Sequence, residues 1–258
     1  LRDQGQSATG TLQDAFDPKL GRHVSLKILN SVFSSNNDLV AAFKNVVLAA
    51  ASMNSLHVLK VYEFGVHNRQ PYMVMEHMQG QFLNEVLEKG ALDQGNAIRL
   101  TQGIVEGLCD LQQQGIIHGE VMPRNILLHK DGKPRFSDFG LARLDGEDDE
   151  HAQSWSSPYY MPPERILNQP EDFRGDFYSL GVTLFYMVTG TLPFFDLDEE
   201  ETKRKKCTQP APDPGEINPD LHPSVVGLVN SLLQANPEDR PGSFEELTDH
   251  LNNIAGHF

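Results

Sequence analysis

The spacing of hydrophobic residues changes character once along the chain, close to Gly80. Before that point the pattern predicts short β-strands and one main helix, which covers residues 37–53. After that point helical spacing dominates, in residues 96–115, 175–190, 222–233 and 243–251. The sequence therefore predicts an α+β fold with two lobes, a small β-rich lobe over residues 1–78 and a larger helical lobe over residues 79–258.

Composition excludes several classes of protein. The chain has 258 residues, of which 39% are hydrophobic and 22% charged, as in an ordinary globular protein. Its net charge of −15 argues against a nucleic-acid-binding surface, which needs basic side chains. The two cysteines, Cys109 and Cys207, cannot build a disulfide framework, and their scarcity favours a reduced, cytoplasmic location.

The ends and apolar runs of the chain bear on its setting. No apolar run approaches the roughly 18 residues of a membrane-spanning helix, so we expect no membrane contact within this segment. The chain starts abruptly at "LRDQGQSATG" without a signal peptide, and we expect it to be excised from a longer protein. That parent protein could still be membrane-anchored.

Short motifs follow one another in order through both predicted lobes. They are "GQSATG" (5–10), "VSLK" (24–27), "MEHM" (75–78), "HGEVMPRN" (118–125), "DFG" (138–140), "MPPE" (161–164) and "RPGSF" (240–244). Each is weak evidence alone, but their order and spacing together resemble the protein kinase family, and specifically its bacterial Ser/Thr members. The resemblance covers nearly the whole chain and implies a bilobal protein kinase-like fold.

This resemblance implies a site for ATP. Gly5 and Gly10 would belong to a loop whose backbone approaches the phosphates, although a serine replaces the middle glycine of that loop. Lys27 would hold the α and β phosphates. Glu76 and Met78 would lie in the hinge segment that meets the adenine.

The same resemblance assigns roles to several other side chains. Asn125 and Asp138 would hold Mg²⁺, because an amide oxygen and a carboxylate beside the phosphates suit a hard cation. Ser25 replaces a small apolar residue that would line the adenine pocket, and it adds one hydroxyl group. Glu164 and Arg240 would form an ion pair in the helical lobe.

Four positions depart from the pattern of an active kinase. Glu120 stands where the catalytic aspartate belongs, and displacing a reacting group by about 1 Å can cost roughly 100-fold in rate. Met122 replaces the lysine that would steady the γ-phosphate, and Gly119 replaces the arginine that would bind a phosphorylated activation loop. Val46 falls where a glutamate would orient the phosphate-binding lysine, and residues 39–62 contain no Asp or Glu.

The expected activation loop contains three serines that phosphorylation could modify. They are Ser154, Ser156 and Ser157. The alternative interpretation is that they are ordinary loop serines that are not phosphorylated. Position 119 is glycine, so the chain lacks the arginine that would bind a phosphorylated serine and thereby order the loop.

These residues leave two main functions open. The first, which the departures favour, is a pseudokinase that acts by binding or scaffolding a protein partner and retains Mg²⁺-ATP binding. The second is a weak or atypical Ser/Thr protein kinase that transfers the γ-phosphate of ATP with Glu120 as base. A metal protein is a third interpretation, but no tight His/Cys spacing supports a site built from His118, His129 and His151.

Overall fold

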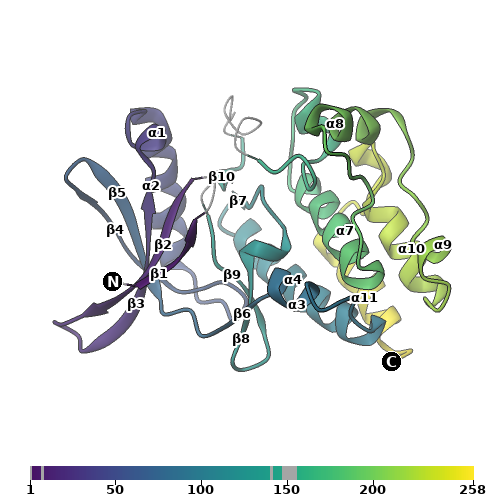
Figure 1. Cartoon of the computed structure of the whole chain (residues 1–258), viewed down its shortest axis with the longest axis horizontal. Coiled ribbons are helices and arrows are strands. Elements are labelled where there is room, and N and C mark those ends of the chain that lie inside the picture. Colours follow the sequence, from purple (N-terminus) through teal and green to yellow (C-terminus); the bar gives the residue numbers. More distant parts are fainter. Residues whose placement is uncertain (1, 7–8, 140–141, 147–155) are drawn as a thin grey trace.

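Two lobes, one built on a sheet and the other on helices, make up the molecule (Figure 1). The computed structural model describes residues 2–6, 9–139, 142–146 and 156–258. The α+β architecture predicted from the sequence is confirmed. The predicted lobe boundary at residues 78 and 79 falls between a strand that ends at Glu76 and a strand that begins at Gly80.

Within the described part of the small lobe, five antiparallel strands form a sheet in the spatial order β1-β2-β3-β5-β4. These strands are β1 (Arg2–Gln6), β2 (Gly10–Asp17), β3 (Arg22–Leu29), β4 (Val61–His67) and β5 (Gln70–Glu76). Two helices, α1 (Ser31–Ser34) and α2 (Asn37–Ser52), connect β3 to β4. The side chain of Asn36 caps α2 by accepting hydrogen bonds from the first backbone N–H groups, and the apolar face of α2 packs against β4.

Helices fill the large lobe. They are α3 (Leu83–Leu87), α4 (Gln94–Gln112), α6 (Pro163–Ile166), α7 (Arg174–Thr189), α8 (Glu199–Thr208), α9 (Pro214–Ile217), α10 (Pro223–Leu232) and α11 (Phe244–Ala255), with the short 3₁₀ helices η1 (Pro123–Asn125) and η2 (Pro237–Asp239). α7 is buried on nearly all sides, as its apolar sequence predicts, and it ends at Gly190 in a left-handed conformation. No helix within the described ranges is both long and apolar enough to span a bilayer.

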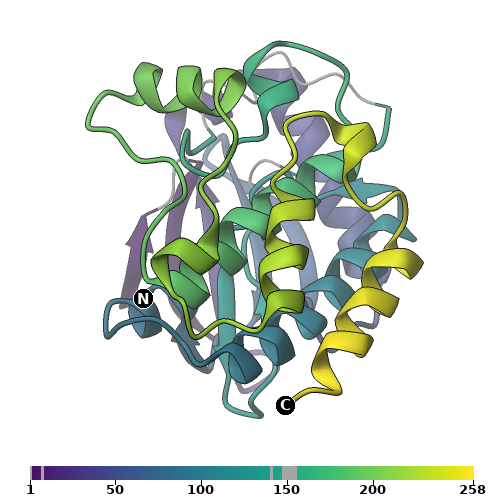
Figure 2. The same ribbon diagram turned by 90° about the vertical axis from the view of Figure 1, so that its right-hand side faces the viewer.

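α7 is the centre of this lobe. α4 and α10 pack against it, and α11 packs against α4. Figure 2 shows α10 and α11 nearest the viewer, on the side of the large lobe that faces away from the small lobe. The opposite side of α7 therefore faces the loops that lie between the two lobes.

Among the residues that the structure describes, two smaller sheets flank these loops. β6 (Gly80–Phe82), β8 (Ile126–His129) and β9 (Pro134–Phe136) form one, and β7 (Ile116–Ile117) pairs with β10 (Arg143–Leu144) in the other. The backbone N–H of Leu59 donates to the carbonyl of Phe136 (3.0 Å), and the N–H of Phe136 donates to the carbonyl of His57 (2.9 Å). These bonds tie the segment before β4 to β9, so the residues that follow β9 lie beside the small lobe.

Candidate functional site

Lys27 of β3 and Asp138 after β9 meet between the lobes. Lys27 is only 2% exposed, and its ammonium group donates a hydrogen bond to Oγ1 of Thr9 (2.5 Å). The same group forms an ion pair with the carboxylate of Asp138. Two residues that the sequence assigned to phosphate and metal binding are thus brought together across the two lobes.

α2 presents an apolar side chain where an active kinase would carry a glutamate. Val46 is 0% exposed and packs in the core with Phe43, Val47 and Ala50. The acidic residue that α2 does contain, Asp38, lies in its first turn. Among the described residues, the carboxylate that pairs with Lys27 is therefore that of Asp138.

The predicted hinge is already engaged by neighbouring side chains. The backbone N–H of Met78 donates to Oγ of Ser25 at 3.2 Å, and Ser25 is fully buried. Nη1 of Arg135 donates to both carboxylate oxygens of Glu76 at 3.1 Å, which joins the end of β5 to β9 in the large lobe. The Ser25 hydroxyl, which looked like a modest change in the sequence, thus already accepts a hydrogen bond from the backbone N–H of Met78 in the predicted hinge.

The glycines of the predicted phosphate loop have different surroundings. Gly5 lies in β1 opposite Leu12, next to an irregularity in the β1–β2 register. Gly10 opens β2, where a Cβ atom would lie only 2.2 Å from the carbonyl oxygen of Ile28. Close contact between β2 and β3 thus requires glycine at position 10 whether or not a phosphate binds. Ser7, the replaced middle glycine, lies outside the described residues.

The segment "HGEVMPRN" is held by the first turn of α7. The backbone N–H groups of His118 and Gly119 both donate to the buried carboxylate of Asp176 at 2.8 Å. Burial raises the pKa of Asp176 to about 6, while these two hydrogen bonds oppose the shift. Gly119 has a φ of 76°, in the left-handed region that glycine adopts without strain.

His118 has a structural role in this segment. Its ring packs against Phe136 and Phe139, with centroids 4.3 and 6.0 Å apart, and burial lowers its pKa to about 4. Its Nδ1 accepts a hydrogen bond from the backbone N–H of Glu120 (3.2 Å), as a neutral imidazole can. No group of three or more His, Cys, Asp or Glu side chains in the described ranges could hold a metal ion, and His151 lies outside those ranges.

Glu120 and Asn125 lie together at the edge of a polar pocket. Nδ2 of Asn125 donates to the backbone carbonyl of Glu120 at 3.0 Å. Burial, followed by the negative charge of Asp138, raises the pKa of Glu120 to about 7. The pocket has a volume of about 550 Å³, and its wall includes Met122 and the segment from Ser156 to Tyr160.

The candidate phosphorylation sites lie in different surroundings. Ser156 is buried, and its hydroxyl accepts a hydrogen bond from Nη1 of Arg165 at 2.9 Å. Ser157 lines the same pocket, and its backbone carbonyl accepts hydrogen bonds from the N–H groups of Tyr160 (3.2 Å) and Met161 (3.1 Å). Ser154 lies outside the described residues.

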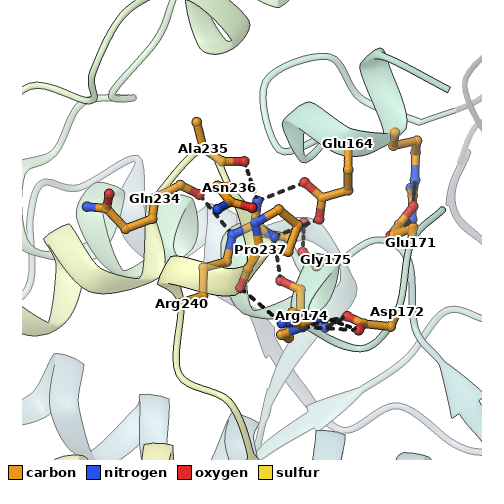
Figure 3. Close-up of polar contacts among 12 residues, drawn as sticks. Glu164, Glu171, Asp172, Arg174, Gly175, Gln234, Ala235, Asn236, Pro237 and Arg240 are labelled. Atoms are coloured by element: carbon orange, nitrogen blue, oxygen red, sulfur yellow. Dashed lines mark hydrogen bonds and ion pairs between the residues drawn. The ribbon is translucent and has the colours of Figure 1, made fainter. Parts of the chain in front are cut away.

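The predicted ion pair of the large lobe is present (Figure 3). Arg240 donates from its two Nη atoms to the carboxylate of Glu164 at 2.6 and 2.7 Å, and both side chains are buried. The same guanidinium also donates to the carbonyls of Arg174, Gln234 and Ala235. This pair fixes α6, and with it the wall of the polar pocket, against α7 and η2.

Two arginines that contact this site were not identified from the sequence. Arg135 holds the hinge through Glu76. Arg165 contacts residues 118–125, the catalytic-loop segment, through the carbonyl of Gly119. The absent side chain at Gly119 is a signal that could have prompted a search for another cation. Nothing in the local sequence would have singled out Arg165 as that cation.

Comparisons with known proteins agree with this geometry. The family model described as the protein kinase domain matches residues 2–251. A probable serine/threonine-protein kinase from Clostridium perfringens is 33% identical over 257 residues, and the match covers 98% of this chain and 38% of that protein. The serine/threonine-protein kinase pkn3 of Myxococcus xanthus is 30% identical over 264 residues, which cover 97% of this chain and 48% of that protein. The chain thus spans less than half the length of these two relatives.

A solved structure supports the fold. The chain is similar to the kinase domain of Mycobacterium tuberculosis PknI, with a TM-score of 0.79 over 99% of this chain and 94% of that chain. The two sequences are 24% identical, so this likeness concerns the fold alone. The family match, the bacterial relatives and the fold together show that the chain belongs to the protein kinase family, as a bacterial Ser/Thr kinase-like member.

Proposed function

We propose that this protein kinase domain acts mainly by binding a protein partner, with little or no phosphotransfer. The observation that carries this proposal is the pairing of Lys27. Its ammonium group is held by Thr9 and Asp138, while α2 offers the buried side chain of Val46. An active kinase needs its lysine oriented by a glutamate of this helix, and no such carboxylate is available here.

The catalytic segment supports the same proposal. Glu120 carries its carboxylate on a side chain one methylene longer than aspartate, and Met122 is buried and uncharged where a lysine would meet the γ-phosphate. Phosphoryl transfer depends on positioning and on charge stabilisation, and both are weakened by these replacements. Together with Val46, these replacements affect the orientation of the lysine, the position of the base and the stabilisation of charge on the γ-phosphate.

We propose that the domain keeps a site for Mg²⁺ and ATP. The carboxylate of Asp138 and the side-chain amide of Asn125 offer oxygen ligands of the kind that Mg²⁺ prefers, and Lys27 lies beside Asp138. The metal, when bound, would neutralise phosphate charge. Lys27 contacts one carboxylate oxygen of Asp138, so the residues that would hold the phosphates and the metal lie side by side, and nucleotide and metal affinity are expected to be linked.

Thermal unfolding with and without ATP and Mg²⁺ tests this site. A ligand at about 100 times its dissociation constant stabilises a fold by roughly 2.7 kcal/mol, which corresponds to a rise of about 5–10 °C in Tm. We expect a Mg²⁺-dependent rise that is lost in Asp138→Ala. The absence of any rise with ATP, with or without metal, would refute nucleotide binding and leave a domain that acts by protein contacts alone.

A weak Ser/Thr protein kinase is the second candidate function, and one observation favours it. Glu120 lines the polar pocket beside Asn125, where a carboxylate could accept the proton of a substrate hydroxyl, and burial raises its pKa toward neutrality. The two functions differ in their response to Glu120→Asp. The binding function predicts no robust turnover in this variant, because Val46 and Met122 remain. A weak kinase predicts a clear gain in Mg²⁺-dependent phosphotransfer.

A further inference from the structure

Arg165 of α6 joins three segments that are distant in sequence. Its Nη1 donates to the carbonyl of Gly119 in the catalytic-loop segment (2.7 Å) and to Oγ of Ser156 in the segment before α6 (2.9 Å). Its Nε and Nη2 donate to the two carboxylate oxygens of Glu171, both at 2.7 Å. Arg165 is 5% exposed, so these bonds form away from water.

The charge of this arginine is balanced from within the chain. The side chain of Glu171 is 7% exposed and pairs in parallel with the guanidinium of Arg165, which is the geometry that gives strong charge-assisted hydrogen bonds. Nη2 of Arg143, from β10, lies 3.5 Å from the same carboxylate. The arginines lower the pKa of Glu171 despite its burial, so it stays ionised.

We infer that Arg165 replaces the absent arginine side chain at position 119 and orders the segment at Ser156 without phosphorylation. A phosphate orders such a segment by supplying negative charge and oxygen acceptors to an arginine. Here the negative charge comes from Glu171, and the acceptors in the two segments are the carbonyl of Gly119 and the unmodified hydroxyl of Ser156. The inference concerns conformation, so it holds whether or not the domain transfers phosphate.

A simple role in stabilising α6 would not explain these contacts. Gly119 and Ser156 lie 46 and 9 residues before Arg165, and neither belongs to α6 or to the loop that contains Glu171. The far end of the Ser156 segment is held separately, since Nζ of Lys206 donates to the carbonyls of Tyr159 (2.5 Å) and Met161 (3.0 Å). Arg165 therefore acts at the end of the pocket wall that is nearest to the catalytic-loop segment.

Hydrogen exchange at single amides tests the inference on protein freed of phosphate by a phosphatase and checked by mass spectrometry. The reporters are the N–H groups of Tyr160 and Met161, which donate to Ser157, and that of Gly119, which donates to Asp176. Ser156→Ala removes one acceptor, with Ser157→Ala as its matched control. Arg165→Lys keeps the charge and removes the fork of donors, with the exposed Arg99→Lys as its control.

We expect all three amides to be protected in the unphosphorylated wild-type protein. Ser156→Ala should speed exchange at Tyr160 and Met161 roughly threefold to tenfold, the effect of one lost hydrogen bond. Arg165→Lys should speed exchange by about tenfold or more at Gly119 as well, because both segments lose a donor. The two control variants and the amides of α10 should match the wild type.

Two results would overturn the inference. One is that Tyr160 and Met161 exchange without protection until the serines are phosphorylated. The other is that Ser156→Ala leaves their exchange as in Ser157→Ala. If Arg165→Lys destabilises the whole fold, exchange in α10 will also rise, and the milder Ser156→Ala variant then decides between the two outcomes.

Discussion

Replacement of Ser25 by alanine should tighten nucleotide binding while weakening the fold. In the free protein, Oγ of Ser25 accepts a hydrogen bond from the backbone N–H of Met78 (3.2 Å) within a fully buried site. An adenine ring that used this N–H would first have to displace the hydroxyl. Alanine removes that competitor, and it also leaves the N–H unsatisfied when no ligand is bound.

The size of both effects follows from the value of one hydrogen bond. An intramolecular hydrogen bond contributes a net free energy of about 0.5–1.5 kcal/mol, so Ser25→Ala should lower the Kd for ATP roughly 2- to 13-fold. A buried donor without a partner costs about 1–3 kcal/mol, so the free energy of unfolding of the unliganded variant should fall by that amount. Loss of the Ser25 hydroxyl thus causes both effects, a gain in ATP affinity and a loss of stability.

Calorimetric titration with ATP and denaturant unfolding would measure these effects on the same samples. Ser179→Ala is a matched control, because Ser179 is also a buried serine with a hydrogen-bonded hydroxyl but lies in α7. We expect the control to lose stability and to keep the ATP affinity of the wild type. An unchanged or weaker affinity in Ser25→Ala would refute the idea that this hydroxyl competes with adenine.

Two further predictions concern buried charges. Arg240→Met should lower the free energy of unfolding by about 3–5 kcal/mol, because it leaves Glu164 buried without its partner, whereas Lys203→Met, which removes an exposed ion pair, should cost less than about 1 kcal/mol. Equal losses in denaturant unfolding would contradict this. His118 has a pKa lowered from 6.5 to about 4, so the folded state binds its proton more weakly than the unfolded state does. Stability should therefore fall as pH drops from about 6.5 to about 4, by roughly 3 kcal/mol from this group. His118→Phe should lose this part of the slope in unfolding curves measured across that range, and an unchanged slope would show that His118 is not its source.

Much of the site could be predicted from the order of the motifs. Lys27 lies in a short apolar strand and Asp138 opens "DFG", and the structure brings the two side chains into an ion pair. The pairing of Glu164 with Arg240 was predicted in the same way and is present. These two contacts could be predicted because proteins that share the fold place residues of these motifs next to each other.

Other contacts could not be predicted, because they depend on how individual atoms pack in the folded structure. Ser25 and Met78 are 53 residues apart, and the change from a small apolar residue to serine gave no indication that its hydroxyl would meet the hinge. Gly10 fits a phosphate loop by its motif, but the structure shows that close packing of β2 on β3 already requires it. Both features depend on distances between atoms in the folded protein, and the spacing of hydrophobic residues in the sequence does not predict those distances.

The most direct test of the central claim is phosphotransfer itself. Wild-type protein and Asp138→Ala, purified in parallel, would be incubated with Mg²⁺ and ATP labelled at the γ-phosphate, and incorporation into the domain and into a basic protein substrate would be measured. A domain that acts by binding should show the same background incorporation in both proteins. Incorporation by the wild type above that background, lost in Asp138→Ala, would contradict the account and identify a working kinase.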